Sequence, residues 1–178
     1  FKTVLIKTLA LARPYILTGY FYQRRVREAV PTQNPETYPY SGAQAQRRIR
    51  DFWSQAVPMT FADEPKTYEE KRRFRYELQD YMRGIFRFDT FGGKKVLEIG
   101  VGSGIDMAEF LRNGAETVGV DFSPLATRSA KLLLKEANFN GHILLSDARY
   151  LPFKDSQFDL VYSFGVIHHI PNVLEVLE

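Results

Sequence analysis

The chain has 178 residues, which is long enough for one ordinary domain with an appendage. Its 44% hydrophobic and 25% charged residues are typical of a soluble globular protein, which we expect in the cytoplasm. It contains no cysteine and three histidines, so a disulfide framework and a thiolate metal site are excluded, and no zinc or iron centre is expected.

The net charge of +3 is distributed unevenly along the chain. Residues 1–90 carry 16 lysines and arginines against 10 acidic residues, whereas residues 91–178 carry 8 against 11. A basic N-terminal half is typical of contact with an anionic membrane, nucleic acid or an acidic substrate. The alternative is an ordinary solvated helical surface, which we favour because the basic clusters at 47–50 and 71–75 are interleaved with apolar residues.

Residues 1–30 form an apolar segment interrupted by cations. Its longest uncharged run, residues 14–23, is too short to span a bilayer, and Lys2, Lys7 and Arg13 interrupt any secretory signal. We interpret the segment either as an amphipathic helix that contacts a membrane surface or as a helix packed on the protein or on a partner. The prolines in residues 31–39 then indicate a linker.

Helices are expected next. Ser41 and Gln44 have the spacing of a capping box, and Thr67 and Glu70 repeat it. After the second pair, apolar residues recur at steps of four and three and predict one long helix with a single, mostly buried stripe, formed by Phe74, Leu78, Tyr81, Ile85 and Phe88. We therefore assign residues 1–40 to the basic segment and its linker, 41–90 to a helical cap region and 91–178 to the main domain.

The pattern changes at residue 94 to alternating strands and helices. Apolar runs predict strands at 94–100, 117–123, 142–148 and 158–166, and helices are expected from about Gly104 to Asn113 and from Ser123–Pro124 to about Asn138. Strands that are apolar without alternation are typical of a parallel sheet covered on both faces. The sequence therefore predicts an α/β fold.

A glycine-rich turn follows the first predicted strand, in the spacing E-x-G-x-G-x-G formed by Glu98, Gly100, Gly102 and Gly104. In parallel sheets ligands bind beyond the carboxyl ends of the strands, and glycine lets a ligand lie against the main chain. A dinucleotide fingerprint would need glycine at the position of Ile105, and the Glu98 carboxylate would repel a pyrophosphate but suit a cationic ligand. The glycine spacing thus predicts a binding turn for a ligand other than NAD. The alternative is a tight turn with a structural role alone.

Acidic residues end three successive predicted strands, namely Glu98, Asp121 and Asp147. Asp121 is placed to accept both hydroxyls of a ribose, and Asp147 to accept an adenine amino group. A single aspartate at a strand end is more often a turn or cap residue, but three such acids together favour a nucleoside ligand.

The stretches VLEIGVGSG, VGVDFS, SDARYLPFKDSQFDLV and SFGVIHHI resemble the class I S-adenosylmethionine-dependent methyltransferases, in the group that includes ubiquinone and menaquinone biosynthesis enzymes. The resemblance covers residues 94–178 and implies a Rossmann-like sheet with strand order 3-2-1-4 and S-adenosyl-L-methionine as cofactor. The family's sheet has more strands than the four in this chain. Because the chain also starts at Phe1 and stops at Glu178 within an expected helix, we interpret it as a C-terminally truncated piece with a complete cofactor-binding half.

The resemblance also implies roles for individual residues. The three glycines would pass beside the methionine part of the cofactor, with Glu98 near its amino group and Asp121 on the ribose. The remaining predicted contacts are Phe122 against adenine, Asp147 and Ala148 on the adenine edge, and Ser163 and Phe164 at the methionine end.

Methyl transfer by this family is an in-line displacement at the sulfonium, for which the protein supplies proximity and orientation. His168 and His169 follow the fourth strand, where an acceptor should enter, and a histidine there could act as a general base. Neighbours in an extended segment point opposite ways, and by resemblance we prefer His169; the alternative is a histidine that hydrogen-bonds its loop. Asp159 begins its strand, far from the site, and is expected to be structural.

We expect a methyltransferase acting on a small or lipid-like acceptor. One alternative is a nucleotide-dependent oxidoreductase, which Ile105 and Glu98 disfavour, and another is a non-catalytic cofactor-binding module. A nucleic-acid partner is not expected, because no N/D-P-P-Y/F motif follows the fourth strand.

Overall fold

The computed structural model describes residues 47–48, 51–52 and 67–170. The predicted N-terminal segment, the linker and the Ser41–Gln44 capping pair lie outside the described residues, as does the expected helix after residue 170. Residues 47–48 and 51–52 are helical, as predicted for that stretch.

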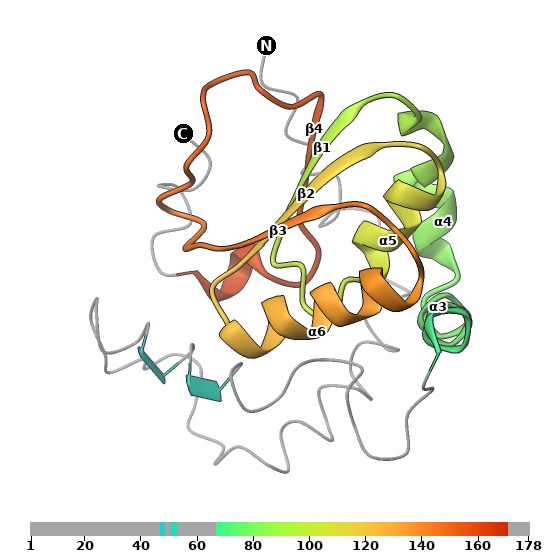
Figure 1. Cartoon of the computed structure of the whole chain (residues 1–178), viewed down its shortest axis with the longest axis horizontal. Helices are drawn as coiled ribbons and strands as arrows, with labels where there is room; N and C mark the ends of the chain where they lie inside the picture. Colours follow the sequence, from blue (N-terminus) through green and yellow to red (C-terminus); the bar gives the residue numbers. More distant parts are fainter. Residues whose placement is uncertain (1–46, 49–50, 53–66, 171–178) are drawn as a thin grey trace.

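Four strands form one parallel sheet with the order β3-β2-β1-β4, which confirms the predicted fold (Figure 1). The strands are β1 (Lys95–Ile99), β2 (Glu116–Asp121), β3 (His142–Leu145) and β4 (Leu160–Tyr162). The predicted length of the fourth strand is wrong, since β4 has three residues. The Ser163 hydroxyl donates to the Ile99 carbonyl at 3.0 Å, and Gly165 has a φ of 72°, so the backbone turns away from β1 and continues into the short 3-10 helix η2 (Ile167–His169).

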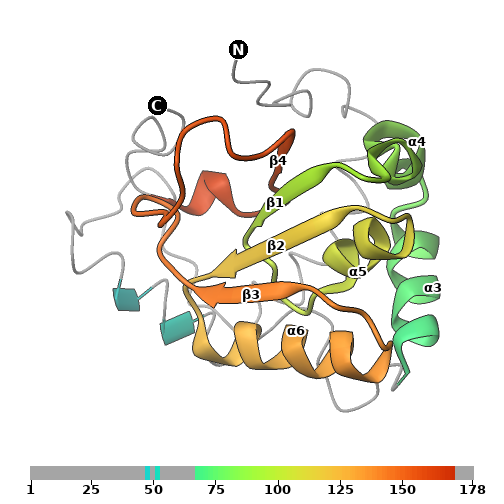
Figure 2. The same cartoon turned by 45° about the horizontal axis from the view of Figure 1, so that its top comes forward.

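Two helices pack on one face of the sheet, α5 (Ile105–Arg112) and α6 (Pro124–Glu136) (Figures 1 and 2). Helix α5 connects β1 to β2 and α6 connects β2 to β3, so both connections move toward the same edge of the sheet. Right-handed crossovers therefore put both helices on the same face. As predicted, Ser123 caps α6, because its hydroxyl accepts the Ala126 amide at 3.2 Å and Pro124 occupies the first turn. The connection from β3 back to β4 covers the other face, where a second core cluster joins strand residues to this connection: Leu97, Ile99 and Val120 with Leu151, Phe153 and Phe158.

The segment before the sheet forms α3 (Tyr68–Leu78), α4 (Tyr81–Phe86) and the 3-10 helix η1 (Phe88–Phe91). The capping box of Thr67 and Glu70 is present, as the sequence predicts. The predicted single helix with one stripe is wrong, since the chain breaks after Leu78 and three stripe residues are exposed: Phe74 by 38%, Leu78 by 51% and Ile85 by 43%.

A different set of side chains from this segment enters the main core cluster together with α5, α6 and the sheet: Tyr68, Tyr76, Met82, Phe86 and Phe88. The break after Leu78 turns α4 relative to α3, so no single helical stripe persists across it. Residues 68–88 thereby share one hydrophobic core with the sheet.

Candidate functional site

The glycine turn lies at the carboxyl end of β1 and is held by its own backbone. The amides of Gly100 and Val101 donate to the Val120 carbonyl at 2.8 and 3.1 Å. A Cβ at Gly100 would lie 2.2 Å from Val166 Cγ2, and one at Gly104 would lie 2.9 Å from the Ala130 Cβ. At Gly102, which has a φ of 53°, a Cβ would meet no atom of the described residues within 4 Å. Gly102 is therefore the member of the three whose bare backbone no described side chain covers.

Asp121 connects the end of β2 to this turn. Its Oδ2 accepts the Gly102 amide and its Oδ1 accepts the Ser123 amide, each at 2.9 Å. Burial raises the pKa of the Asp121 carboxyl, and the backbone amides oppose that shift. A carboxylate has about four acceptor positions, and the amides of Gly102, Ser123 and Phe122 leave part of this capacity for a ligand.

Glu98 is buried beneath the turn, with 3% of its surface exposed. Among the residues that the structure describes, no donor hydrogen-bonds to its Oε2. Burial raises the pKa of the Glu98 carboxyl well above its ordinary value; Asp106 and Asp121 push it in the same direction, whereas Arg75 opposes them. A buried polar atom without a partner is costly, and a cationic ligand group would satisfy this one.

A buried ion pair beside Glu98 is the part of the site that the sequence did not predict. Asp106, in the first turn of α5, accepts Arg75 Nε at 3.2 Å and Nη2 at 2.6 Å. The hydroxyls of Tyr76 and Tyr162 donate to the same carboxylate at 3.0 and 2.9 Å. The Arg75 guanidinium also lies over the Phe164 ring, 5.1 Å from its centroid. The pair thus joins α3 to the methionine end of the predicted site.

The end of β3 carries the predicted adenine contacts. Asp147 is engaged by Arg149, whose Nη2 donates to Oδ2 at 2.7 Å. Ala148 is half-buried and packs against the second core cluster. Phe122, which follows β2, is half-buried. Asp121 ends β2 and Asp147 follows the neighbouring strand β3, and the Ser146 amide donates to the Asp121 carbonyl at 2.9 Å, so both acids lie at the carboxyl edge of the sheet.

The residues after β4 border the glycine turn through Val166. Phe164 is half-buried and packs edge-to-face against Phe86, with ring centroids 5.8 Å apart. His169 is half-buried in η2, and its amide donates to the Val166 carbonyl at 2.8 Å. The sequence predicts an extended segment at the two histidines. This prediction is wrong, because residues 167–169 form a 3-10 helix. The His168 side chain lies outside the described part of the structure.

Asp159 lies at the opposite, amino-terminal edge of the sheet. Its Oδ2 accepts the Lys95 amide and its own amide donates to the Lys95 carbonyl, both at 2.8 Å. This is the structural role that the sequence predicts for it.

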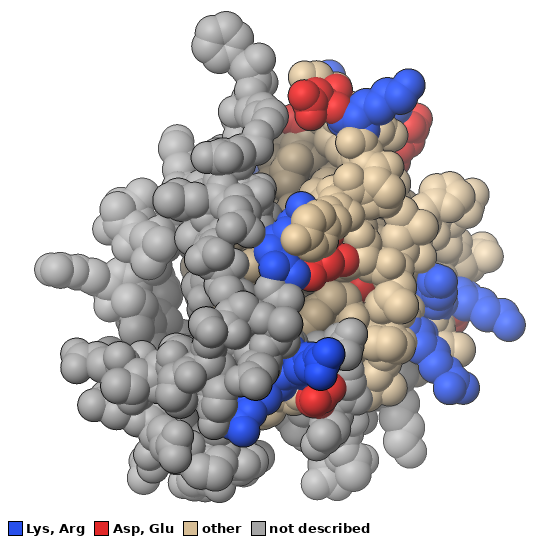
Figure 3. Space-filling model, turned by 90° about the vertical axis from the view of Figure 1, so that its left-hand side faces the viewer, with Lys and Arg blue, Asp and Glu red and all other residues tan. Residues whose placement is uncertain are grey.

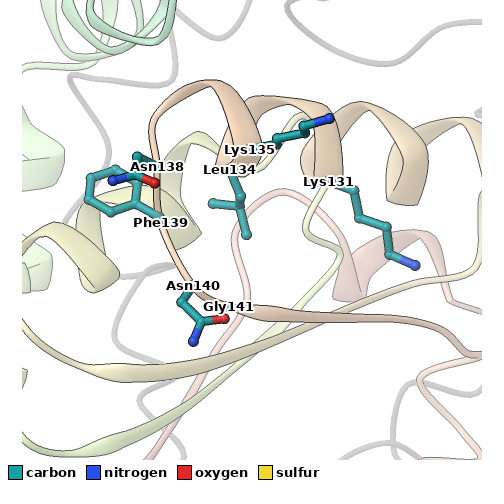
Figure 4. Close-up of a pocket in the computed structure, with 7 residues that line it drawn as sticks. All are labelled: Lys131, Leu134, Lys135, Asn138, Phe139, Asn140 and Gly141. Carbon is teal, nitrogen blue, oxygen red and sulfur yellow. The ribbon is translucent and has the colours of Figure 1, made fainter.

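Two hollows in the described surface do not coincide with the predicted site. One, of about 360 Å³, lies at the end of α6 and is lined by residues that include Lys131, Lys135 and Asn140 (Figure 4). The other, of about 410 Å³, lies between α3 and α6 near Tyr68 and Glu136. Neither is lined by a predicted cofactor residue. On the face in Figure 3, lysines and arginines of the described residues are interspersed with acidic and neutral ones.

Residues 97–178 match the family model of the methyltransferase domain. The chain carries a class I S-adenosylmethionine-dependent methyltransferase domain. Over 81 residues it is 35% identical to a ubiquinone biosynthesis O-methyltransferase of Azoarcus sp. (strain BH72), covering 45% of this chain and 35% of that protein. Over 93 residues it is 33% identical to a demethylmenaquinone methyltransferase of Thermobifida fusca (strain YX), covering 50% of this chain and 39% of that protein.

The fold of the methyltransferase domain is also found in solved structures. Magnesium protoporphyrin IX methyltransferase (ChlM) from Synechocystis PCC 6803, crystallised with bound SAM, matches with a TM-score of 0.61 and 16% identity over 78% of this chain and 71% of that one. The cofactor of the family is S-adenosylmethionine, as the sequence predicts. The matched stretch spans just over a third of the length of the two curated relatives.

In the described residues, no helix is both long and apolar enough to cross a membrane.

Proposed function

We propose that the domain binds S-adenosyl-L-methionine along the carboxyl edge of its sheet, and that the protein transfers the methyl group to a small or lipid-like acceptor of the quinone-precursor kind. The observation that carries this proposal is Gly102, whose backbone faces open space while its amide holds Asp121. A ligand can lie against the main chain at that point without displacing a side chain.

The donor set around the turn fits this cofactor. Glu98 offers an unpartnered, buried carboxyl oxygen, which suits the cationic amino group of the methionine part. Asp121 retains acceptor capacity for the two ribose hydroxyls, and Asp147 lies one strand further, where the adenine edge would follow. In this proposal Phe122 and Ala148 flank the adenine, and Ser163 and Phe164 border the methionine end.

The chemistry that the cofactor supplies is a methyl group already activated on sulfur, so the chain has to bind, orient and exclude water. His169 is proposed as the general base that accepts a proton from the acceptor hydroxyl or carbon acid. His169 lies three residues after Val166, which packs on the glycine turn, and this short separation supports the proposal. The names of the two relatives, a ubiquinone O-methyltransferase and a demethylmenaquinone methyltransferase, support a quinone-type acceptor.

Binding and turnover test the two halves of the proposal separately. In calorimetry we expect S-adenosylhomocysteine to bind and NADH not to bind, and the reverse result would indicate a nucleotide-dependent oxidoreductase. Full-length protein incubated with methyl-labelled cofactor and demethylated quinone precursors should yield a labelled product detectable by mass spectrometry. Binding of S-adenosylhomocysteine without any labelled product would favour the non-catalytic cofactor-binding module.

A further inference from the structure

The segment after β3 holds an ion pair that the proposed function does not explain. Arg149 lies two residues after Asp147 and contacts its carboxylate three times. Its Nε donates to Oδ1 at 3.1 Å, its Nη2 donates to Oδ2 at 2.7 Å, and its backbone amide donates to Oδ1 at 3.0 Å. The guanidinium also lies over the Tyr150 ring, 5.1 Å from the centroid.

These contacts restrict what the carboxylate can still bind. A carboxylate has about four acceptor positions. In Asp147, Arg149 occupies two on Oδ1 and one on Oδ2, so with respect to the described residues a single position remains on Oδ2. The paired bonds of a guanidinium fork also fix the plane of the carboxylate, which gives the remaining position a defined direction.

The pair also stabilises the charged form of the carboxylate. The Arg149 side chain lowers the pKa of the Asp147 carboxyl below its ordinary value, at which an aspartate is already ionised at neutral pH, so the group accepts hydrogen bonds and has no proton to donate. The Arg149 side chain is 14% exposed and that of Asp147 39%, so solvent screens this pair less than the exposed pair of Arg87 and Asp89, at 61% and 64%.

We propose that Arg149 is a positioning residue that makes the nucleoside end of the site selective for a purine with an amino group, rather than an oxo group, at position 6. The inference rests on the proposed function, which puts the adenine edge at Asp147. A 6-amino group donates to the remaining Oδ2 position. A 6-oxo group instead presents lone pairs to an ionised carboxylate, which is unfavourable because neither of these two groups has a proton to share. The N1 proton of a 6-oxo purine lies one ring position away from the direction that the guanidinium fixes for the remaining acceptor position.

Calorimetry with two ligands tests this inference: S-adenosylhomocysteine and its 6-oxo analogue S-inosylhomocysteine. Arg149→Met should weaken binding of the adenosyl ligand by roughly tenfold, which is the effect of losing one well-oriented charge-assisted hydrogen bond. Binding of the inosyl ligand should weaken much less. The ratio of the two affinities should therefore fall. Arg149→Lys keeps the positive charge but lacks the paired hydrogen bonds of a guanidinium, so it should restore part of the ratio of the two affinities.

Arg87→Met is the matched control, because it breaks an Arg–Asp pair of the same sequence spacing before β1. It should leave both affinities unchanged. A purely structural role of Arg149 would lower the melting temperature and both affinities together. An unchanged ratio in folded Arg149→Met, or tighter binding of the adenosyl ligand because the guanidinium competes with it, overturns the inference and leaves the proposed function standing. Failure of the wild type to bind S-adenosylhomocysteine overturns the proposed function, and this inference with it.

Discussion

The two edges of the sheet are built from the same four parallel strands, but their acidic residues have different surroundings. At the amino-terminal edge, Asp159 accepts the amide of Lys95, and Asp89 pairs with Arg87 in solvent. At the carboxyl-terminal edge, Glu98 is buried with an oxygen that no described residue satisfies, and Asp121 holds a turn whose backbone lies open. The two acids of the first edge have their contacts within the chain, whereas Glu98 at the second edge keeps a buried acceptor for a ligand.

The largest expected effect contrasts a buried acid of the carboxyl edge with an exposed one of the amino edge. Asp106→Ala would leave Nε and Nη2 of Arg75 and two tyrosine hydroxyls without their acceptor, and should lower the free energy of unfolding by about 3–5 kcal/mol. Asp89→Ala removes half of an exposed pair and should change it by less than about 0.5 kcal/mol. Urea unfolding measures both, and equal losses would refute the contrast.

The second effect separates two glycines with open surroundings. Gly102 and Gly93 both have positive φ, and in the part of the chain that the structure describes a Cβ at either meets nothing within 4 Å. Valine at either position should cost about 1–2 kcal/mol of stability through backbone strain. Gly102→Val alone should weaken S-adenosylhomocysteine binding by more than about tenfold, equivalent to about 1.4 kcal/mol, because the side chain occupies the space of the cofactor. Normal calorimetric binding by a folded Gly102→Val protein would show that this glycine serves the turn alone.

The third effect concerns the two aspartates that hold backbone amides at opposite edges. Asp121→Ala should cost about 1.5–3 kcal/mol of S-adenosylhomocysteine affinity through lost hydrogen bonds to the ribose. Because Asp121 also holds the Gly102 amide, Asp121→Asn serves as a companion that keeps an acceptor of similar shape. Asp159→Ala removes the acceptor of the Lys95 amide and should lower the melting temperature without changing affinity. Unchanged calorimetric affinity in folded Asp121→Ala would argue against the ribose contact.

The smallest expected effect is a pH dependence that comes from Glu98. Its raised pKa means that the folded empty protein holds this proton more tightly than the unfolded chain. Glu98 therefore contributes stability below its unfolded pKa, and that contribution is lost as pH rises through its folded pKa. Affinity for a cationic amino group should change in the opposite sense and rise over the same range, by at most about tenfold per pH unit.

Glu98→Gln should remove both trends, because glutamine does not titrate. Calorimetry in two buffers of different ionisation enthalpy should detect proton release on S-adenosylhomocysteine binding below the folded pKa in the wild type, and none from this site in the variant. A pH profile that is identical in the two proteins would assign the titration to another group.

The sequence predicts features that depend on neighbouring residues. The Ser123–Pro124 start of α6 and the Thr67–Glu70 capping box arise from contacts three residues apart, and the strand order arises from the family resemblance. The predicted burial of the apolar stripe in the cap region is wrong because burial depends on tertiary contacts. The helix α3 stops at Leu78, and Tyr76 points inward to Asp106, 30 residues further along the chain.

In the candidate site, too, the sequence predicts features that depend on neighbouring residues and misses contacts between distant ones. The glycines and the acids at the strand ends could be read from spacing alone. The partner of Asp106 could not, because no local pattern links it to Arg75, which lies on a separate helix. Arg149 was equally hidden, since an arginine two residues after an aspartate is common on loops, and its three contacts with the carboxylate are visible only in three dimensions.

The contact between Gly100 and Val166 gives the turn a role on the acceptor side as well. The two methyl groups of Val166 occupy the space where a side chain at position 100 would begin. Even alanine at this position would force the segment after β4 outward, and η2 with His169 would move with it. Under the proposed function, Gly100 would set the spacing between the two reacting partners, so its replacement should raise the KM for the acceptor as well as weaken cofactor binding.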